Sequence, residues 1–255
     1  MNALLSTGAI TALACVACLS ASSARADFTP VRDSGSEATV QEIFDHYFTV
    51  TATGADTGVM GAAHESYTFA DGSTATRIND FGAGHASPID LLTGTSNDLD
   101  SIWTDGVSVF TAEARFAGFS QSFGIDTTPG DGVDHSALFS VSGNGYTDTG
   151  LGGAGGPMHL TGEWSWTRGG SGHGPWSSNP ADNPDGLDHM ITYQIDDSSA
   201  QTVWWLFFED LNSLGDKDYN DLVVEVRAVP IPVPGAVALG VAGFSGFALL
   251  RRRLR

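Results

Sequence analysis

The amino-acid sequence predicts a mostly β protein, with a single antiparallel β-sandwich or jelly-roll-like domain and one short N-terminal helix. Three observations lead to this class. Short runs of β-branched and aromatic residues recur along the chain, clusters of Gly, Asp, Asn, Ser and Pro separate them, and one segment alone has a helical pattern. An apolar segment at each end of the chain is expected to lie outside this domain.

The distribution of charge along the chain agrees with this division. The chain has 255 residues with 30 acids and 11 bases, and residues 27–228 hold every acid but only six of the bases. This body (residues 27–228) has a formal charge of −24, which repels nucleic acid and attracts cations. Both cysteines, Cys15 and Cys18, precede the body, so no disulfide can stabilise it.

Residues 1–26 are predicted to be a signal peptide. Their apolar run ends shortly before Ala24-Arg25-Ala26, which fits the small-x-small rule for cleavage before Asp27. No Lys or Arg precedes this run, so the terminal amine is the only positive charge in front of it. A lipoprotein signal is disfavoured, because neither cysteine has Leu three residues before it.

The C-terminal segment is predicted to cross a membrane. Residues 229–234 form a Pro spacer, and the apolar residues 235–250 lead into an Arg cluster, so residues 235–255 make up the expected transmembrane helix. The apolar part would be about 24 Å long as a helix, and snorkelling arginines can extend it towards the roughly 30 Å thickness of a hydrocarbon core. Arginine favours the cytoplasmic side, so the body would be periplasmic or extracellular and anchored in the inner membrane.

This arrangement of spacer, apolar helix and arginines resembles the bacterial PEP-CTERM sorting signal. The chain has Pro230-Ile231-Pro232 in place of Pro-Glu-Pro and is more similar to the Val-Pro-Leu-Pro-Ala variant. The resemblance implies that an exosortase-like enzyme recognises the tail. It also implies a protein linked to the cell surface and to extracellular polysaccharide, either released or attached at the surface after processing.

Within the body, we expect one helix followed by strands. Ser36 is a suitable N-cap with acids in the turn after it, so the helix is expected over about 37–46. Strands are expected over residues 67–70, 107–116, 137–141, 159–166, 190–195, 202–208 and 222–226. The Gly-rich residues 143–156 and 169–186 are expected to form long surface loops.

A five-residue pattern occurs twice in the body. Residues 131–135 and 185–189 both read Asp-Gly-x-Asp-His, and an apolar strand follows each copy. Asp-Gly forms turns, and the second Asp can accept hydrogen bonds from backbone amides, which favours a turn that starts a strand. The alternative is a pair of Asp/His ligand sites.

The densest chemical signal lies between the last two expected strands, where residues 209–221 hold five carboxylates against one Lys. Carboxylates this close repel one another unless something neutralises them, and Ca²⁺ binds oxygen ligands of this kind. The predicted metal ligands are Glu209, Asp210, Asp216, Asp218, Asn220 and Asp221, with Asp188 as a further candidate. The alternative is a solvated acidic hairpin. Zn²⁺ is disfavoured because the body lacks cysteine.

The same region resembles a family of bacterial secreted domains, domain of unknown function 4114. The residues that carry the resemblance are 208–211 and 215–226, with 188–193 before them, and the similar stretch spans about 185–227. The family has no assigned activity. The resemblance therefore implies a β-rich secreted module with a capacity for metal binding, and it implies no reaction.

Two hypotheses of function follow. The first is a non-enzymatic, exported protein of the cell surface or exopolysaccharide matrix with a Ca²⁺-binding acidic loop. The alternative is a carbohydrate-binding module that uses Trp164, Trp166 and Trp176, because the first two alternate on one strand and share a face. An enzyme is disfavoured, since the body has neither a G-x-S-x-G elbow nor a P-loop lysine.

Overall fold

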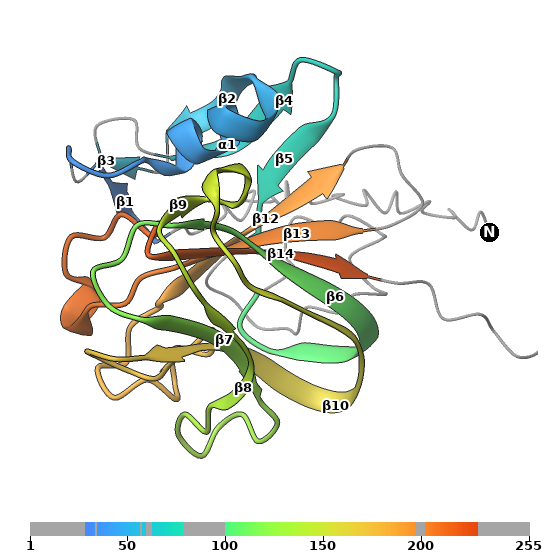
Figure 1. The fold of residues 1–255 in the computed structure, drawn as a ribbon, viewed down its shortest axis with the longest axis vertical. Coiled ribbons are helices and arrows are strands. Elements are labelled where there is room, and N and C mark those ends of the chain that lie inside the picture. The colour runs from blue at the N-terminus through green and yellow to red at the C-terminus, as the bar shows by residue number, and fades with distance from the viewer. Residues whose placement is uncertain are drawn as a thin grey trace, which may run out of the picture.

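The computed structural model describes residues 29–33, 35–56, 58–59, 63–78, 100–196 and 202–228. The predicted signal peptide and C-terminal helix lie outside these residues. In the described part, the mostly antiparallel β class with one α-helix is confirmed (Figure 1). None of the helices in these ranges is long and apolar enough to span a membrane.

The predicted helix is present as α1 (Val40–Phe48), but it begins later than expected. Thr39 is the N-cap in place of Ser36. The Thr39 hydroxyl accepts a hydrogen bond from Glu42 N at 3.2 Å, and the Glu42 carboxylate accepts one from Thr39 N at 2.9 Å. This capping box satisfies two backbone amides at the helix start. Glu37 is consequently left in the irregular segment before the helix.

All seven predicted strands are confirmed. They are β4 (His64–Phe69), β6 (Trp103–Arg115), β8 (Ser136–Val141), β10 (Ala154–Gly170), β12 (Met190–Asp196), β13 (Val203–Phe208) and β14 (Leu222–Ala228). The sequence did not predict β1 (Val31–Arg32), β2 (Val50–Asp56), β3 (Gly58–Val59), β5 (Thr74–Arg77), β7 (Gln121–Asp126), β9 (Gly145–Tyr146) or β11 (Trp176–Ser177). Two 3₁₀ turns, η2 (Thr147–Thr149) and η3 (Asn212–Leu214), complete the elements of the described residues.

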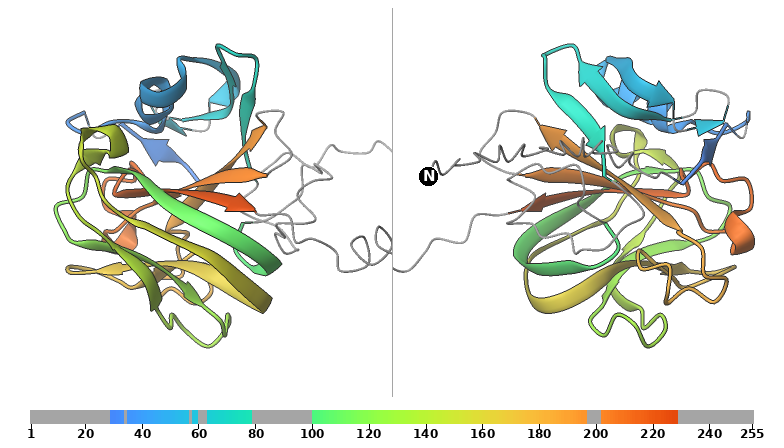
Figure 2. Two further views of the ribbon diagram at one scale, coloured as in Figure 1. Left: turned by 45° about the vertical axis from the view of Figure 1, so that its right-hand side comes forward. Right: turned by 180° about the vertical axis from the view of Figure 1, so that it is seen from behind.

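The main sheet is open, with the strand order β2-β4-β5-β12-β13-β14-β6-β10-β7-β8. Strand β10 changes partner along its length: residues 154–164 pair with β6, and residues 165–170 pair with β7. Two register shifts interrupt its pairing with β6. The sheet therefore continues from the central strands into the layer of β7 and β8 (Figures 1 and 2).

The central strands bury both faces, because successive side chains of a strand point to opposite sides. On β13, Trp204, Leu206 and Phe208 join a core with Trp103, Phe123, Trp164 and Trp166. Val203, Trp205 and Phe207 join a second core with Phe44 of α1, Tyr67 and Tyr193. The loop that connects β13 to β14 consequently leaves the sheet between two apolar layers.

The predicted long surface loops are only partly correct. Residues 154–156 and 169–170 belong to β10, and β11 lies inside the second Gly-rich segment. Trp176, Ser177 and Asn183 of that segment are buried. Asn183 Oδ1 accepts a hydrogen bond from Ser177 N at 2.7 Å, and Asn183 Nδ2 donates to Ser177 O at 2.9 Å. These side-chain bonds fix the internal shape of the segment, and the pairing of β11 with β10 holds it against the body.

Candidate functional site

The predicted acidic loop, residues 209–221, connects β13 to β14 on the side of the molecule where β1 lies (Figures 1 and 2). Four of its residues have left-handed backbone conformations: Ser213 with φ 58°, Leu214 with φ 56°, Lys217 with φ 63° and Tyr219 with φ 55°. Tyr219 is fully buried, and its hydroxyl donates to Asp188 O at 2.7 Å. Non-glycine residues in this conformation cost about 1–3 kcal/mol each and cluster at functional sites. The surrounding contacts thus hold the loop in a costly shape.

Three predicted ligands come together at the base of the loop. One carboxylate oxygen from each of Glu209, Asp218 and Asp221 lies within 4.8 Å of the others. The three residues are buried, with 0%, 1% and 7% of their surface exposed. Ca²⁺–oxygen distances are about 2.3–2.6 Å, so two oxygens on one ion lie at most about 5 Å apart. The spacing of these carboxylates therefore fits a shared Ca²⁺.

We call Glu209, Asp218 and Asp221 the first acidic group. Its hydrogen bonds do not use every carboxylate oxygen. Glu209 Oε1 accepts from Leu211 N at 3.0 Å, whereas Glu209 Oε2 accepts no hydrogen bond within the described part of the chain. Asp221 Oδ2 accepts from Asp210 N at 2.7 Å. Burial raises the pKa of Glu209 and of Asp221, and nearby carboxylates raise both further. Without a cation, the protonated forms of Glu209 and Asp221 therefore persist to a higher pH in the folded protein than in the unfolded chain.

A second acidic group shares Asp218 with the first. One carboxylate oxygen from each of Glu37, Asp216 and Asp218 lies within 4.8 Å of the others. Asp216 is exposed and Glu37 is half-buried. Burial raises the pKa of Glu37, and the charge of Asp216 raises it further. The sequence analysis missed Glu37 because it assigned this residue to a helix, and no local signal connects it to the loop.

Asn220 is another predicted ligand and directly precedes Asp221 in the sequence. Its side chain is fully buried. Its Nδ2 donates a hydrogen bond to Ala38 O at 2.8 Å. Its Oδ1 accepts no hydrogen bond from the residues that the structure describes. A buried amide oxygen without a donor is costly, and it is also an oxygen ligand that Ca²⁺ accepts.

Two predicted ligands, Asp210 and Asp188, belong to neither acidic group. Asp210 Oδ2 lies 3.1 Å from Arg168 Nη2 in a fully buried ion pair, and Gln121 Nε2 also donates to it. Asp188 Oδ2 accepts from Thr29 Oγ1 at 3.0 Å, and Asp188 Oδ1 accepts from Met190 N at 3.2 Å. The structure thus pairs Asp210 with a protein cation and uses Asp188 to hold backbone segments.

The two Asp-Gly-x-Asp-His copies occupy turns. His135 lies between two hydroxyls, with Nε2 at 2.9 Å from Ser122 Oγ and Nδ1 at 2.8 Å from Thr167 Oγ1. In the second copy, His189 Nε2 lies 3.0 Å from Asp185 Oδ2, and His189 Nδ1 lies 3.1 Å from Glu209 O. Both ring nitrogens of each histidine thus have protein partners, which favours the structural interpretation.

The three tryptophans of the carbohydrate-binding alternative do not form an open aromatic face. Trp164, Trp166 and Trp176 are buried, with 1%, 0% and 3% of their surface exposed. The Trp176 ring stacks on His189 at a centroid distance of 3.9 Å, and its Nε1 donates to Asp210 O at 2.8 Å. In this conformation, the three rings have no face on which a sugar could stack.

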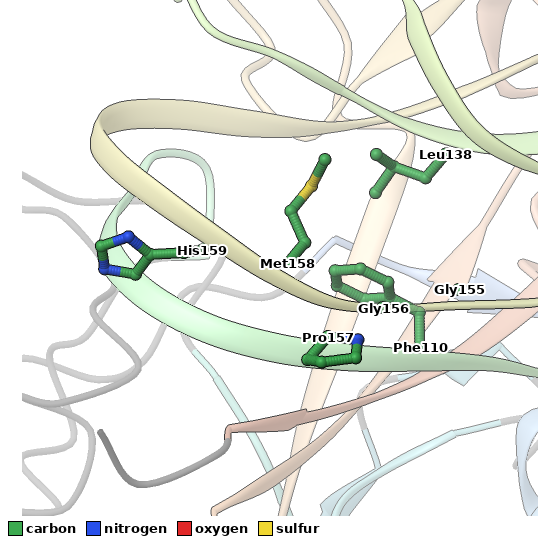
Figure 3. A pocket seen from close by; sticks show the side chains of 7 residues that line it. All are labelled: Phe110, Leu138, Gly155, Gly156, Pro157, Met158 and His159. Atoms are coloured by element: carbon green, nitrogen blue, oxygen red, sulfur yellow. The ribbon is translucent and has the colours of Figure 1, made fainter. Parts of the chain in front are cut away.

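An open hollow of about 410 Å³ lies beside the first half of β10, away from the acidic loop (Figure 3). It is lined by Phe110, Leu138, Gly155, Gly156, Pro157, Met158 and His159. Among these lining residues, His159 alone has a polar side chain, and its ring points away from Leu138 and Met158 (Figure 3). Specific small-molecule sites combine an apolar surface with several convergent polar groups, whereas this lining has one polar side chain.

Comparison with known proteins confirms the family resemblance. Residues 143–229 match the model of the domain of unknown function 4114. The matched stretch contains the loop between β13 and β14 and begins well before the similar stretch predicted from the sequence. Glu37 lies outside it. No curated protein matches this chain.

Two lectins are among the solved structures that match this chain. They are the lectin CV2L of Chromobacterium violaceum, solved in complex with alpha-methyl-fucoside, and the C-terminal domain of the lectin BC2L-C from Burkholderia cenocepacia. Each is 16% identical to this chain, with a TM-score of 0.32, and the alignment covers 52% of this chain and 97% of the lectin chain. A likeness of this size does not extend to a ligand.

Proposed function

We propose that this chain is a non-enzymatic, exported protein of the cell surface or exopolysaccharide matrix whose β13–β14 loop binds Ca²⁺. One observation carries the proposal: Glu209, Asp218 and Asp221 converge in a buried position with a spacing that fits one cation. Buried charges in proteins are paired or coordinate metals. The oxygen of Asn220 is a candidate for a neutral ligand in the same loop.

The chemistry of the donors favours Ca²⁺ among the common cations. Every candidate ligand offers oxygen, and the body has no cysteine, which argues against Zn²⁺. Mg²⁺ demands near-ideal octahedral geometry and retains several waters. Ca²⁺ accepts a flexible shell of carboxylate, amide and backbone oxygens, and a loop between two strands can supply such a shell. The proposal contains no reaction, because the buried carboxylates leave no access for a substrate.

The direct test is a calorimetric titration of the chain with Ca²⁺, combined with thermal unfolding in Ca²⁺ and in chelator. Extracellular Ca²⁺ modules bind at about 10⁻⁴–10⁻³ M, so we expect saturable binding at millimolar concentrations. The double variant Asp218→Asn with Asp221→Asn should lose the binding and retain the β-rich circular dichroism spectrum. Asn preserves the size of each side chain and its acceptor oxygen.

Asp131→Asn is the matched control, since Asp131 is an exposed acid of a turn outside both acidic groups. It should bind Ca²⁺ as the wild type does. Wild-type protein whose melting temperature is the same in Ca²⁺ and in chelator would instead favour a protonated acidic hairpin. An equal response to Mg²⁺ would contradict the choice of cation.

The proposed delivery to the cell surface depends on the tail and has a separate test. We propose that residues 235–255 anchor the body in the inner membrane until an exosortase-like enzyme acts on the tail. The chain should therefore fractionate with membranes in a cell that lacks exosortase, and a variant without residues 229–255 should be released as soluble protein. Identical fractionation of the two forms would contradict the anchor. Association with extracellular polysaccharide remains a prediction from the tail.

A further inference from the structure

We propose that Glu37 is a ligand of a second cation position in the same centre, bridged to the first by Asp218, and that cation binding thereby fastens the N-terminal segment to the body. The N-terminal segment comprises the described residues of 29–48. The inference rests on the proposed function. It adds a ligand from outside the family-matched residues and a consequence for the fold.

The first observation is the geometry of the second acidic group. Oxygens of Glu37, Asp216 and Asp218 lie within 4.8 Å of one another, the limit that also describes the first group. Asp218 belongs to both groups and has two carboxylate oxygens. A carboxylate can therefore bridge two cations, one on the side of Glu209 and one on the side of Glu37.

The second observation is the buried amide of Asn220, a loop residue that contacts the N-terminal segment. Asn220 Nδ2 donates to Ala38 O, the carbonyl of the residue next to Glu37. This bond fixes the amide plane and with it Asn220 Oδ1, which accepts no hydrogen bond among the described residues. The loop thus holds an unused, fully buried oxygen on a side chain that bonds to Ala38.

The third observation is how the N-terminal segment is attached to the body around this point. Arg32 N donates to Lys217 O at 2.7 Å, and Thr29 Oγ1 donates to Asp188 Oδ2 at 3.0 Å. Val31 and Val40 pack in the same core as Tyr219. The acidic loop is therefore part of the surface on which the segment lies, beside the sheet residues that contact Phe44. Carboxylates this close repel one another when all are ionised, and a cation would convert this repulsion into attraction.

The test is native mass spectrometry and hydrogen exchange on the full chain, with and without Ca²⁺, for wild type and Glu37→Gln. Wild type should bind two Ca²⁺ per chain, and Ca²⁺ should slow amide exchange in both the loop and the N-terminal segment. Glu37→Gln should bind one Ca²⁺ fewer. Its loop should still be protected by Ca²⁺, whereas residues 29–48 should exchange at the rate seen in chelator.

Asp33→Asn is the matched control from the same segment. Asp33 is exposed, its Oδ1 accepts a hydrogen bond from Gly35 N, and Asn retains an acceptor there. This variant should behave as wild type. If wild type and Glu37→Gln bind the same number of Ca²⁺ ions and show the same protection, the second position is refuted while the first remains. If wild type binds no Ca²⁺, the proposed function itself fails.

Discussion

Replacing Glu209 with Gln should change the stability of the protein in opposite directions depending on Ca²⁺. The Glu209 side chain is fully buried, one of its oxygens accepts no hydrogen bond in the described chain, and Asp218 and Asp221 lie close by. In chelator, glutamine replaces a carboxyl group that burial disfavours in its charged form, and its amide can donate to the neighbouring carboxylates. In Ca²⁺, the same change removes a ligand. Glu209→Gln should therefore be the more stable form without Ca²⁺ and the less stable form with it.

The size of each effect follows from the burial and from mass action. A buried acceptor without a partner costs about 1–3 kcal/mol, so the variant should gain stability of this order in chelator. A cation that binds only the folded state adds about 2.7 kcal/mol at a hundredfold excess over its Kd. In proteins of about 150–250 residues, 1 kcal/mol shifts the melting temperature by about 2–4 °C. Ca²⁺ should therefore raise the melting temperature of the wild type by about 5–10 °C and that of the variant by little.

Thermal unfolding of both proteins in excess chelator and in excess Ca²⁺ gives the four melting temperatures that the comparison needs. Glu163→Gln is the matched control, because it makes the same chemical change on an exposed residue of β10. It should leave the response to Ca²⁺ unchanged. A variant that melts lower than wild type by the same amount in both conditions would refute the reasoning, because Glu209 would then be stabilising without a cation.

Two further predictions concern pH and the buried ion pair. In chelator, the free energy of unfolding should fall as the pH rises above the ordinary glutamate pKa of 4.5. Burial raises the folded-state pKa of Glu209 and of Asp221, so the folded protein holds protons that the unfolded chain has released. Stability then decreases with rising pH, because the folded state binds more protons than the unfolded state. Denaturant titrations across this range measure the slope, and a rise in stability with pH would contradict it. Asp210→Ala should lower stability by about 3–5 kcal/mol equally with and without Ca²⁺, since it leaves the buried Arg168 unpaired. If Ca²⁺ stabilises this variant less than it stabilises the wild type, Asp210 belongs to the cation centre.

The sequence predicted the acidic loop well because its members are close in the chain. The apolar run before Glu209 and the run after Asp221 pair as β13 and β14, with Phe208 opposite Leu222. A hairpin brings together the residues that flank its loop, whatever else the protein does. The missed strands have a different cause. The segment of β5 contains two Thr, one Ala and one Arg and has no apolar run, and it becomes a strand because β4 and β12 flank it.

The sequence could not predict Glu37 or the partner of Asp210, because both depend on packing between distant segments. Glu37 reaches the loop only because Val31 and Val40 join the core that also contains Tyr219. Asp210 meets Arg168 only because β10 continues past its pairing with β6 and joins β7. A count of carboxylates along the chain treats Glu209 and Asp210 alike, whereas the fold gives them different neighbours.

These different neighbours explain why the loop should need a cation from solution. Arg168 is fully buried, and its guanidinium bonds to Asp210, Gln121 and the carbonyl of His173. Burying a charge is costly unless it is paired, and this arginine pairs with Asp210. Glu209, Asp218 and Asp221 converge at the same strand end, where Glu209 and Asp221 have no ion pair of this kind among the described residues, and the pKa values of both are raised. Protons can neutralise these three carboxylates, but the resulting carboxyl groups remain crowded at a spacing that suits Ca²⁺. The competition between protons and Ca²⁺ for these three residues is the property that the Glu209→Gln comparison measures.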